Sequence, residues 1–294
     1  MGGPSFEVAC IAHAFANKLS DPSALDVGSG DGRNCTYLAE LGFDVTAIEE
    51  DSKLSEILIA NAKARELAIE IYNGDLQDFV PSKIFDVVLF LGILHFLPRS
   101  LLKPLLHQFQ NCTSGGGVHI ITISHSEFDD SASDFLKLQG HINSADRELI
   151  RSSYSSWSGL AYERYVKFDC HNNGIVDRHP IEKFVFQKGK FPSMEMRVSE
   201  VELVDSQSGR ALLDCFSPTM LTKHRYNEIC EQYGTPDFQA CAKPVEGQYS
   251  LLGKEPHNQS IAFWGRTKCY FEGEILVGLA RYDSEVFFSD FSIN

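Results

Sequence analysis

The chain has 294 residues, of which 43% are hydrophobic and 22% charged, as in a globular protein large enough for one elaborated domain. Its formal net charge of −14 argues against a nucleic-acid partner, because few basic side chains are left over to contact phosphates. No apolar run approaches the roughly 20 residues that span a bilayer, no secretion signal is recognisable, and the cysteines form no disulfide scaffold. We therefore expect a cytoplasmic protein with no membrane partner.

Strands and helices alternate over the first 126 residues. Apolar residues at helical spacing predict a helix over residues 6–19. Short apolar runs predict strands at residues 24–27, 44–48, 69–72, 85–91 and 118–123. The helices between them are expected at residues 33–41, 54–67 and 100–111. Strands without a polar face indicate a parallel sheet covered on both sides, so residues 1–126 are expected to form a doubly wound α/β core.

The pattern changes after residue 126. Residues 126–158 are polar and rich in serine, and residues 162–213 contain the apolar–polar alternation of half-buried antiparallel strands. We expect residues 127–215 to be a β-rich insertion after strand five that covers the site or joins two copies in a homodimer. Residues 216–294 would then complete a mostly parallel, seven-stranded sheet and end in a hairpin. Its last helix is expected at 220–232, its last two strands at 237–243 and 259–268, and further strands at 238–242, 260–264 and 274–281.

The turn after the first strand is the most informative segment. Three alternating glycines, Gly28, Gly30 and Gly32, allow a sharp turn into a helix and leave no Cβ to block a ligand. About 20 residues further on, Glu49 ends the second strand, where a carboxylate can accept hydrogen bonds from both hydroxyls of a ribose. The two features predict a cofactor that carries a nucleoside. A dinucleotide fold would need its third glycine at position 33, where this chain has Arg33.

The residues from Asp26 to Asn34 closely resemble the first motif of class I S-adenosylmethionine-dependent methyltransferases, in the tellurite-resistance branch. The shared features are the Gly-Arg-Asn that follows the glycines and the Leu-Gly-Phe-Asp-Val-Thr that leads into strand two. The resemblance covers residues 1–125 well and implies a Rossmann-like methyltransferase fold with S-adenosyl-L-methionine as cofactor. Two features depart from it. Glu49 replaces the more usual aspartate, and the β-rich insertion has no counterpart in the small members, so their substrates cannot be transferred.

The same resemblance implies contacts to the cofactor. The turn that starts at Asp26 would lie against its amino-acid end, with Leu91 beneath the methionine part. Asp75, after strand three, would accept a hydrogen bond from the adenine amino group, and the backbone N–H of Leu76 would meet a ring nitrogen.

The sequence contains few candidate catalytic residues, as expected for methyl transfer from an activated sulfonium. His95 and His125 follow strands four and five, where a general base or a substrate ligand would stand, although a histidine in such a place is often a core residue. The candidates for contact with a small-molecule acceptor are Arg33, Asn34, Tyr154 and Trp157. No metal is predicted, because the cysteine and histidines at residues 170–179 are irregularly spaced.

The leading hypothesis is therefore a methyltransferase in which a small molecule attacks the sulfonium methyl directly. Three alternatives stay open. One is an NAD(P)-dependent oxidoreductase, against which Arg33 counts. The others are a non-methylating enzyme that uses the same sulfonium and a catalytically silent scaffold.

Overall fold

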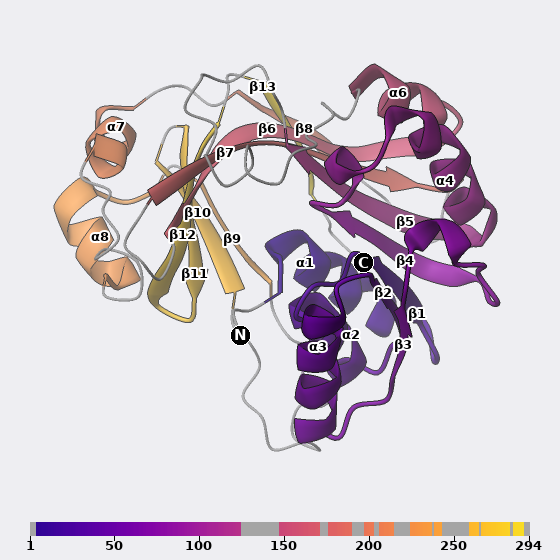
Figure 1. Cartoon of the computed structure of the whole chain (residues 1–294). Coiled ribbons are helices and arrows are strands. Elements are labelled where there is room, and N and C mark those ends of the chain that lie inside the picture. The colour runs from indigo at the N-terminus through magenta and orange to yellow at the C-terminus, as the bar shows by residue number, and fades with distance from the viewer. Residues whose placement is uncertain are drawn as a thin grey trace.

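The computed structural model describes residues 4–124, 147–170, 176–189, 197–202, 206–214, 224–236, 238–242, 259–264, 266–282 and 285–290. The strands in these ranges belong to one large curved sheet, which Figure 1 shows from the side. Its strand order is β3-β2-β1-β4-β5-β7-β6-β12-β11-β10-β9, and β13 and β8 branch off at β6. The sheet therefore has a first part made of early strands and a second part made of late ones.

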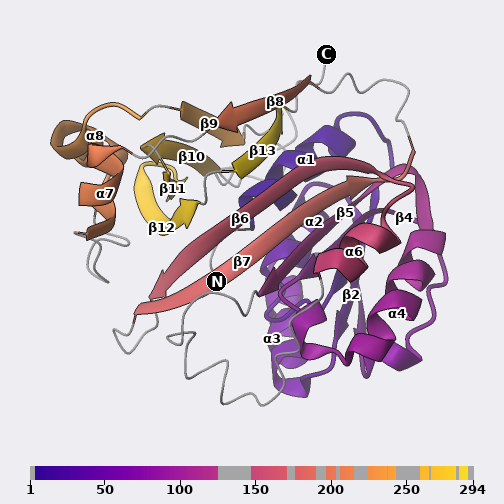
Figure 2. The same cartoon turned by 90° about the horizontal axis from the view of Figure 1, so that it is seen from above.

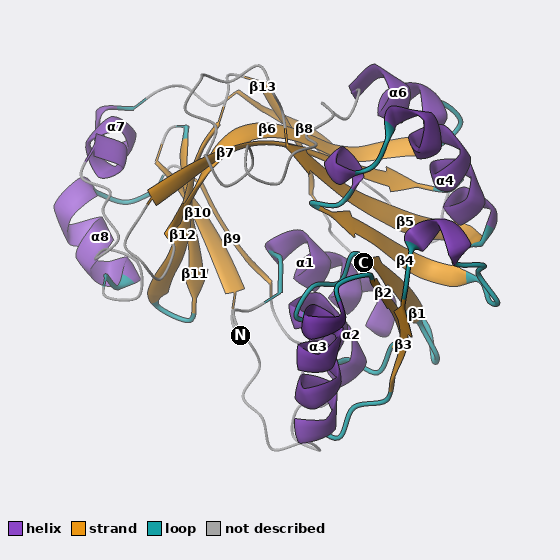
Figure 3. Cartoon of the chain, viewed as in Figure 1, coloured by secondary structure: helices purple, strands orange, loops and turns teal. Residues whose placement is uncertain are grey.

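The first part is the predicted parallel core, which is confirmed. Its strands, in the order β3-β2-β1-β4-β5, are β1 (Ser23–Val27), β2 (Asp44–Glu49), β3 (Ile69–Asn73), β4 (Phe85–Leu91) and β5 (Thr113–Ser124). Helices cover both of its faces (Figure 3): α1 (Phe6–Ala16), α2 (Arg33–Glu40) and α3 (Ser52–Ala64) on one, α4 (Arg99–Asn111) and α6 (Arg147–Ser153) on the other. In β4, Val87 and Val88 pack into opposite cores. Apolar side chains on both faces explain the unbroken hydrophobic run of this strand.

The strand beside β5 differs from the prediction. That position belongs to β7 (Val176–Gln187), which pairs antiparallel with β5 and with β6 (Ser158–Cys170). The prediction had placed the last two core strands at residues 237–243 and 259–268. The physical reason lies in three consecutive side chains, Phe184, Val185 and Phe186, which are all buried. Phe184 and Phe186 pack into one core and Val185 into the other, so β7 needs cover on both faces and takes an interior position.

The β6–β7 hairpin also builds the second part of the sheet. Figures 1 and 2 show it running from the parallel strands to the late ones, where the end of β6 pairs with β12. The late elements are α7 (Gln207–Asp214), α8 (Tyr226–Tyr233), β8 (Arg197–Glu202), β9 (Phe238–Ala242), β10 (Gln259–Trp264), β11 (Thr267–Glu272), β12 (Ile275–Tyr282) and β13 (Glu285–Asp290). The strands predicted at 238–242, 260–264 and 274–281 are confirmed. The helix predicted at 220–232 corresponds to α8, which begins at Tyr226. Helix α7 occupies residues for which alternating strand structure was expected.

Helix α1 lies between the two parts of the sheet. Its apolar residues Val8, Ile11 and Phe15 are buried in the core under the parallel strands. The same helix also contacts β9 and β10 of the second part. A helix that is apolar on nearly every side is expected to be buried, and α1 meets this condition by packing between the two parts of the sheet.

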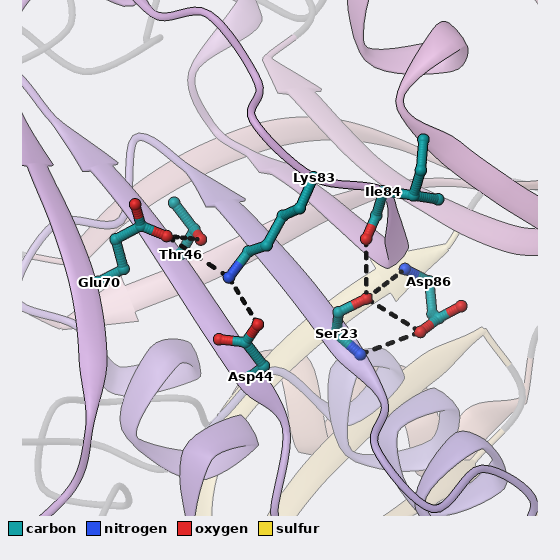
Figure 4. A network of polar contacts seen from close by, with 7 residues as sticks. All are labelled: Ser23, Asp44, Thr46, Glu70, Lys83, Ile84 and Asp86. Carbon is teal, nitrogen blue, oxygen red and sulfur yellow. Dashed lines mark hydrogen bonds and ion pairs between the residues drawn. The ribbon is translucent and has the colours of Figure 1, made fainter.

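The amino ends of the parallel strands carry a polar network, drawn in Figure 4. Lys83 Nζ lies 2.7 Å from Asp44 Oδ2 and 3.4 Å from Glu70 Oε2. Ser23 Oγ donates to the carbonyl of Ile84, and Asp86 Oδ2 accepts from the Ser23 backbone N–H at 3.0 Å. These contacts connect the amino ends of β1–β4, whereas the candidate site lies at the carboxyl ends of the same strands. No helix in the described ranges has the length and apolar character needed to cross a bilayer.

Candidate cofactor site

The glycine turn forms at the carboxyl end of β1. Gly28, Gly30 and Gly32 have φ values of 71°, 59° and 84°, in the left-handed region that favours glycine. The backbone N–H of Gly28 donates to the carbonyl of Ile48 at 2.9 Å, which holds the turn against the end of β2. A Cβ on Gly32 would lie 2.1 Å from Leu58 Cδ1, so a side chain at that position would have to displace the buried Leu58.

Glu49 braces this turn from the end of β2. Its side chain is only 8% exposed, and its two carboxylate oxygens accept separate backbone hydrogen bonds. Oε2 accepts from Gly30 N–H at 2.7 Å, and Oε1 accepts from Asp51 N–H at 2.9 Å. Each carboxylate oxygen has a second lone pair, so the group can still accept from a ligand hydroxyl.

A cavity of about 560 Å³ opens beside Gly28 and Glu49. Its polar lining consists mainly of four carboxylates, those of Glu49, Glu50, Asp51 and Asp75. Its apolar lining includes Ile93, Phe96 and Leu97, which lie in or beside the short 3₁₀ helix η2 (Leu94–Phe96) that follows β4. None of the described residues that line it is basic. The cavity therefore suits a ligand with hydroxyl groups, an apolar ring system and positive charge.

Asp75 and Leu76 stand together on this cavity, one strand beyond Glu49. Asp75 precedes the 3₁₀ helix η1 (Leu76–Asp78), and its Oδ1 accepts from Gln77 N–H at 2.8 Å. Asp75 is exposed, whereas the Leu76 side chain is buried. The fold thus brings together Gly28, Glu49, Asp75 and Leu76, as the predicted cofactor contacts require.

Four other predicted cofactor residues are not part of the cavity lining: Gly30 and Gly32 of the turn, Asp26 and Leu91. Asp26 is buried at the end of β1 and accepts a hydrogen bond from Cys35 Sγ at 3.1 Å. Burial raises the pKa of Asp26 to about 6, against the opposing effects of the Cys35 hydrogen bond and the nearby Arg33 charge. Leu91 packs against the core cluster beneath α1 and α2. Asp26 therefore lies near the glycine turn as a buried residue that contacts α2 through Cys35.

His95 lies next to the cavity without lining it. The ring is buried, and Nδ1 accepts from the backbone N–H of Ser124 at 3.3 Å. In a neutral ring this bond places the proton on Nε2. The His95 ring also stacks obliquely on Phe96, with centroids 4.3 Å apart. His125 lies outside the described residues.

The predicted acceptor contacts are dispersed in the structure. Arg33 is exposed at the start of α2, whereas Asn34 is buried and its Oδ1 accepts from Ser5 N–H at 3.0 Å. Tyr154 lies in the core, where its hydroxyl is 2.6 Å from His119 Nδ1, and Trp157 packs 4.7 Å from the same ring. The prediction had placed Tyr154 and Trp157 over the acceptor, whereas neither lines the cavity, because both pack beneath α4 and α6.

Sequence reasoning missed the apolar wall of the cavity. Ile93, Phe96 and Leu97 follow β4 directly, and the end of a parallel strand is the signal that could have found them. It also missed Glu50 and Asp51, which follow β2 in the same way. Among the side chains that the structure describes, no three His, Cys, Asp or Glu residues gather closely enough to hold a metal ion.

The strand order β3-β2-β1-β4-β5 with an antiparallel β7 beside it, and the cavity at the carboxyl ends, define the methyltransferase-like class of α/β proteins. The crystal structure of TehB from Haemophilus influenzae has this fold: it superposes with a TM-score of 0.50 over 60% of this chain and 61% of its own, at 20% identity.

The family model of the tellurite resistance protein TehB matches residues 11–174, and the chain belongs to that family. The match confirms the resemblance of the glycine motif. A Haemophilus influenzae protein named as a probable S-adenosyl-L-methionine-dependent methyltransferase TehB is 26% identical over 164 residues, which are 54% of this chain and 56% of that protein. A ubiquinone biosynthesis O-methyltransferase of Rickettsia canadensis is 31% identical over 108 residues, 37% of this chain and 45% of its own. The chain thus spans about half the length of the curated relatives it matches.

Proposed function

We propose that this protein is an S-adenosyl-L-methionine-dependent methyltransferase that acts on a small-molecule acceptor. The observation that carries the proposal is the cavity at the carboxyl ends of β1–β4. Glu49, the last residue of β2, and Asp75, just after the adjacent β3, both line it, and no described lining residue is basic. Membership of the TehB family supports the same cofactor, because curated relatives carry that activity in their names.

The charge of the cavity favours this cofactor over a dinucleotide. A pyrophosphate would face the carboxylates of Glu49, Glu50 and Asp51, and like charges in a partly enclosed site repel strongly. A phosphate at the glycine turn would also compete with Glu49 for the Gly30 N–H, which the carboxylate already holds. A ligand with a sulfonium and an ammonium group meets attraction instead. These contacts argue against the NAD(P)-dependent alternative.

The roles of the chain's residues follow from these positions. Glu49 would accept hydrogen bonds from ribose hydroxyls through its remaining lone pairs, while the glycine turn holds the carboxylate in place. Asp75 would accept from the adenine amino group through Oδ2, and Leu76 would offer its backbone N–H and cover the ring. Phe96 and Leu97 provide the apolar surface against which a flat base can pack.

When bound, S-adenosyl-L-methionine supplies a methyl group activated by a positively charged sulfur, so the chain needs to align an acceptor and exclude water. His95 and His125 are the candidates for handling the acceptor's proton. For His95 to accept a proton, Nδ1 must release the Ser124 N–H. Nδ1 then either takes the proton itself or carries the ring proton, so that Nε2 is free to accept. Arg33, at the open start of α2, is the candidate for pairing an anionic group of the acceptor.

Calorimetry tests the cofactor assignment. The full chain is titrated separately with S-adenosylhomocysteine and with NAD⁺, and we expect saturable heat with the first alone. Heat with NAD⁺ alone would reverse the assignment. The reaction is tested by incubating the chain with S-adenosyl-L-methionine and a small-molecule fraction. A product heavier by one methylene unit supports methyl transfer, whereas transfer of a larger fragment supports the non-methylating alternative.

A further inference from the structure

A buried cluster of four charged side chains joins the two parts of the sheet. Lys183 of β7 forms ion pairs with Glu7 of α1 and, at 3.0 Å, with Glu163 of β6. Lys268 of β11 lies 3.6 Å from the same Glu163 carboxylate and 4.0 Å from that of Glu7. Both lysine side chains are only 1% exposed. The cluster therefore contains two positive and two negative groups that are largely removed from water.

Buried ion pairs add little to the stability of a protein, so we ask instead which segments this cluster holds in place. Removing charges from water costs several kcal/mol per ion, and buried pairs recover this only when each group has partners in good positions. Lys268 is also held by aromatic rings, with Nζ 4.8 Å from the centroid of Tyr270 and 5.5 Å from that of Phe263. The late strand β11 thus presents one ammonium group, at a defined place, to helix α1 and the hairpin.

A short chain of contacts leads from this cluster to the glycine turn. Glu7 lies in the first turn of α1, two residues after Ser5, the N-cap residue of the helix. The backbone N–H of Ser5 donates to Asn34 Oδ1 at 3.0 Å. Asn34 is the second residue of α2, whose N-cap is Gly32. The start of α1 is therefore held on one side by Lys183 and Lys268, and on the other by the helix that carries the cofactor turn.

We propose that Lys268 is a positioning residue for the cofactor site. By holding Glu7 and Glu163, it fixes the start of α1, and α1 in turn holds α2 and the glycine turn through Asn34. The second part of the sheet thereby supports the geometry of the first at a distance. The effect on cofactor affinity rests on the proposed function, whereas the effect on α1 and the turn does not.

Hydrogen exchange of the full chain measures the coupling without any cofactor. Lys268→Met keeps most of the length of the side chain and removes its charge. In this variant we expect amides of residues 5–17 and 28–36 to exchange about tenfold faster. Amides of α4, which packs in the core on the other face of the sheet from α1, should keep their rate. The exposed Lys103→Met is the matched control and should leave all these segments unchanged.

Two further variants separate positioning from loss of stability. Glu163→Gln/Lys268→Met restores charge balance, so recovery of the melting temperature with exchange still fast at the turn supports positioning. Lys268→Arg keeps the charge and should restore slow exchange. The proposal is overturned if exchange in Lys268→Met matches the parent, or if it rises equally in α4.

Binding of S-adenosylhomocysteine provides a second readout. We expect Lys268→Met to raise its dissociation constant about tenfold. If the parent chain binds none of this ligand, the proposed function fails, and the exchange experiment still decides the coupling. If the parent binds it and Lys268→Met binds equally well, the coupling to the cofactor site is wrong while the proposed function stands.

Discussion

The buried Asp26 makes a prediction about pH. Its pKa is raised from 3.8 to about 6 in the folded protein, mainly by burial. The folded state therefore holds this proton more tightly than the unfolded state does. The stabilising contribution of the protonated group is fully present below the unfolded pKa and is lost as the pH rises through about 6. The difference between the two pKa values corresponds to about 3 kcal/mol as an upper bound.

Asp26→Asn should remove this pH dependence. The asparagine Oδ1 can still accept from Cys35, and any cost of its buried amide group is the same at every pH. We expect the free energy of unfolding of Asp26→Asn, relative to the parent, to rise by up to about 3 kcal/mol between pH 4 and pH 8. Urea unfolding at intervals across this range measures it, with the exposed Asp78→Asn as control. A difference that stays constant with pH, or that falls as pH rises, would refute the reasoning.

Two substitutions, each with a control, test the packing of the glycine turn and the buried charge of Glu182 in β7. Gly32→Ala should lose about 3 kcal/mol of unfolding free energy, because its φ is 84° and the added Cβ would lie 2.1 Å from Leu58 Cδ1. Gly42→Ala has a similar φ of 88° but open space around the added Cβ, and should lose about 1 kcal/mol. Equal losses would contradict this. Arg147→Met takes the bidentate partner from Glu182, which is 0% exposed, and should cost about 3 kcal/mol in urea unfolding. A loss no larger than that of the exposed Arg151→Met would show that Glu182 needs no such partner.

The part of the fold that could be predicted from the sequence is the part determined by residues that are close together in the chain. The glycine turn, Glu49 and Asp75 could be predicted because each lies at or just after the end of a strand that is visible in the sequence. The structure brings Gly28, Glu49 and Asp75 to one cavity. The position of β7 could not be read in this way. Its charged residues Glu182 and Lys183 give the appearance of a half-exposed strand, because their partners are remote in the sequence.

Remote partners also explain why the predicted acceptor residues do not lie at the cavity. An aromatic side chain serves equally well in a core and in a binding site, so sequence alone did not separate the two for Tyr154 and Trp157. Their neighbours His119 and Phe186 come from β5 and β7, and only the tertiary structure brings these strands under α6. Asn34 is similar, since its partner Ser5 lies in the segment before α1.

The most direct test of the account is the affinity of three variants for S-adenosylhomocysteine, measured by titration calorimetry. Glu49→Gln and Asp75→Asn should each weaken binding by about 10- to 100-fold, the equivalent of losing hydrogen bonds to a charged group. Asp75→Asn keeps the Oδ1 that caps η1 and should fold normally. Glu56→Gln, on the exposed side of α3, should bind like the parent. Parent-like binding by folded Glu49→Gln and Asp75→Asn would contradict the assignment of this cavity to the cofactor.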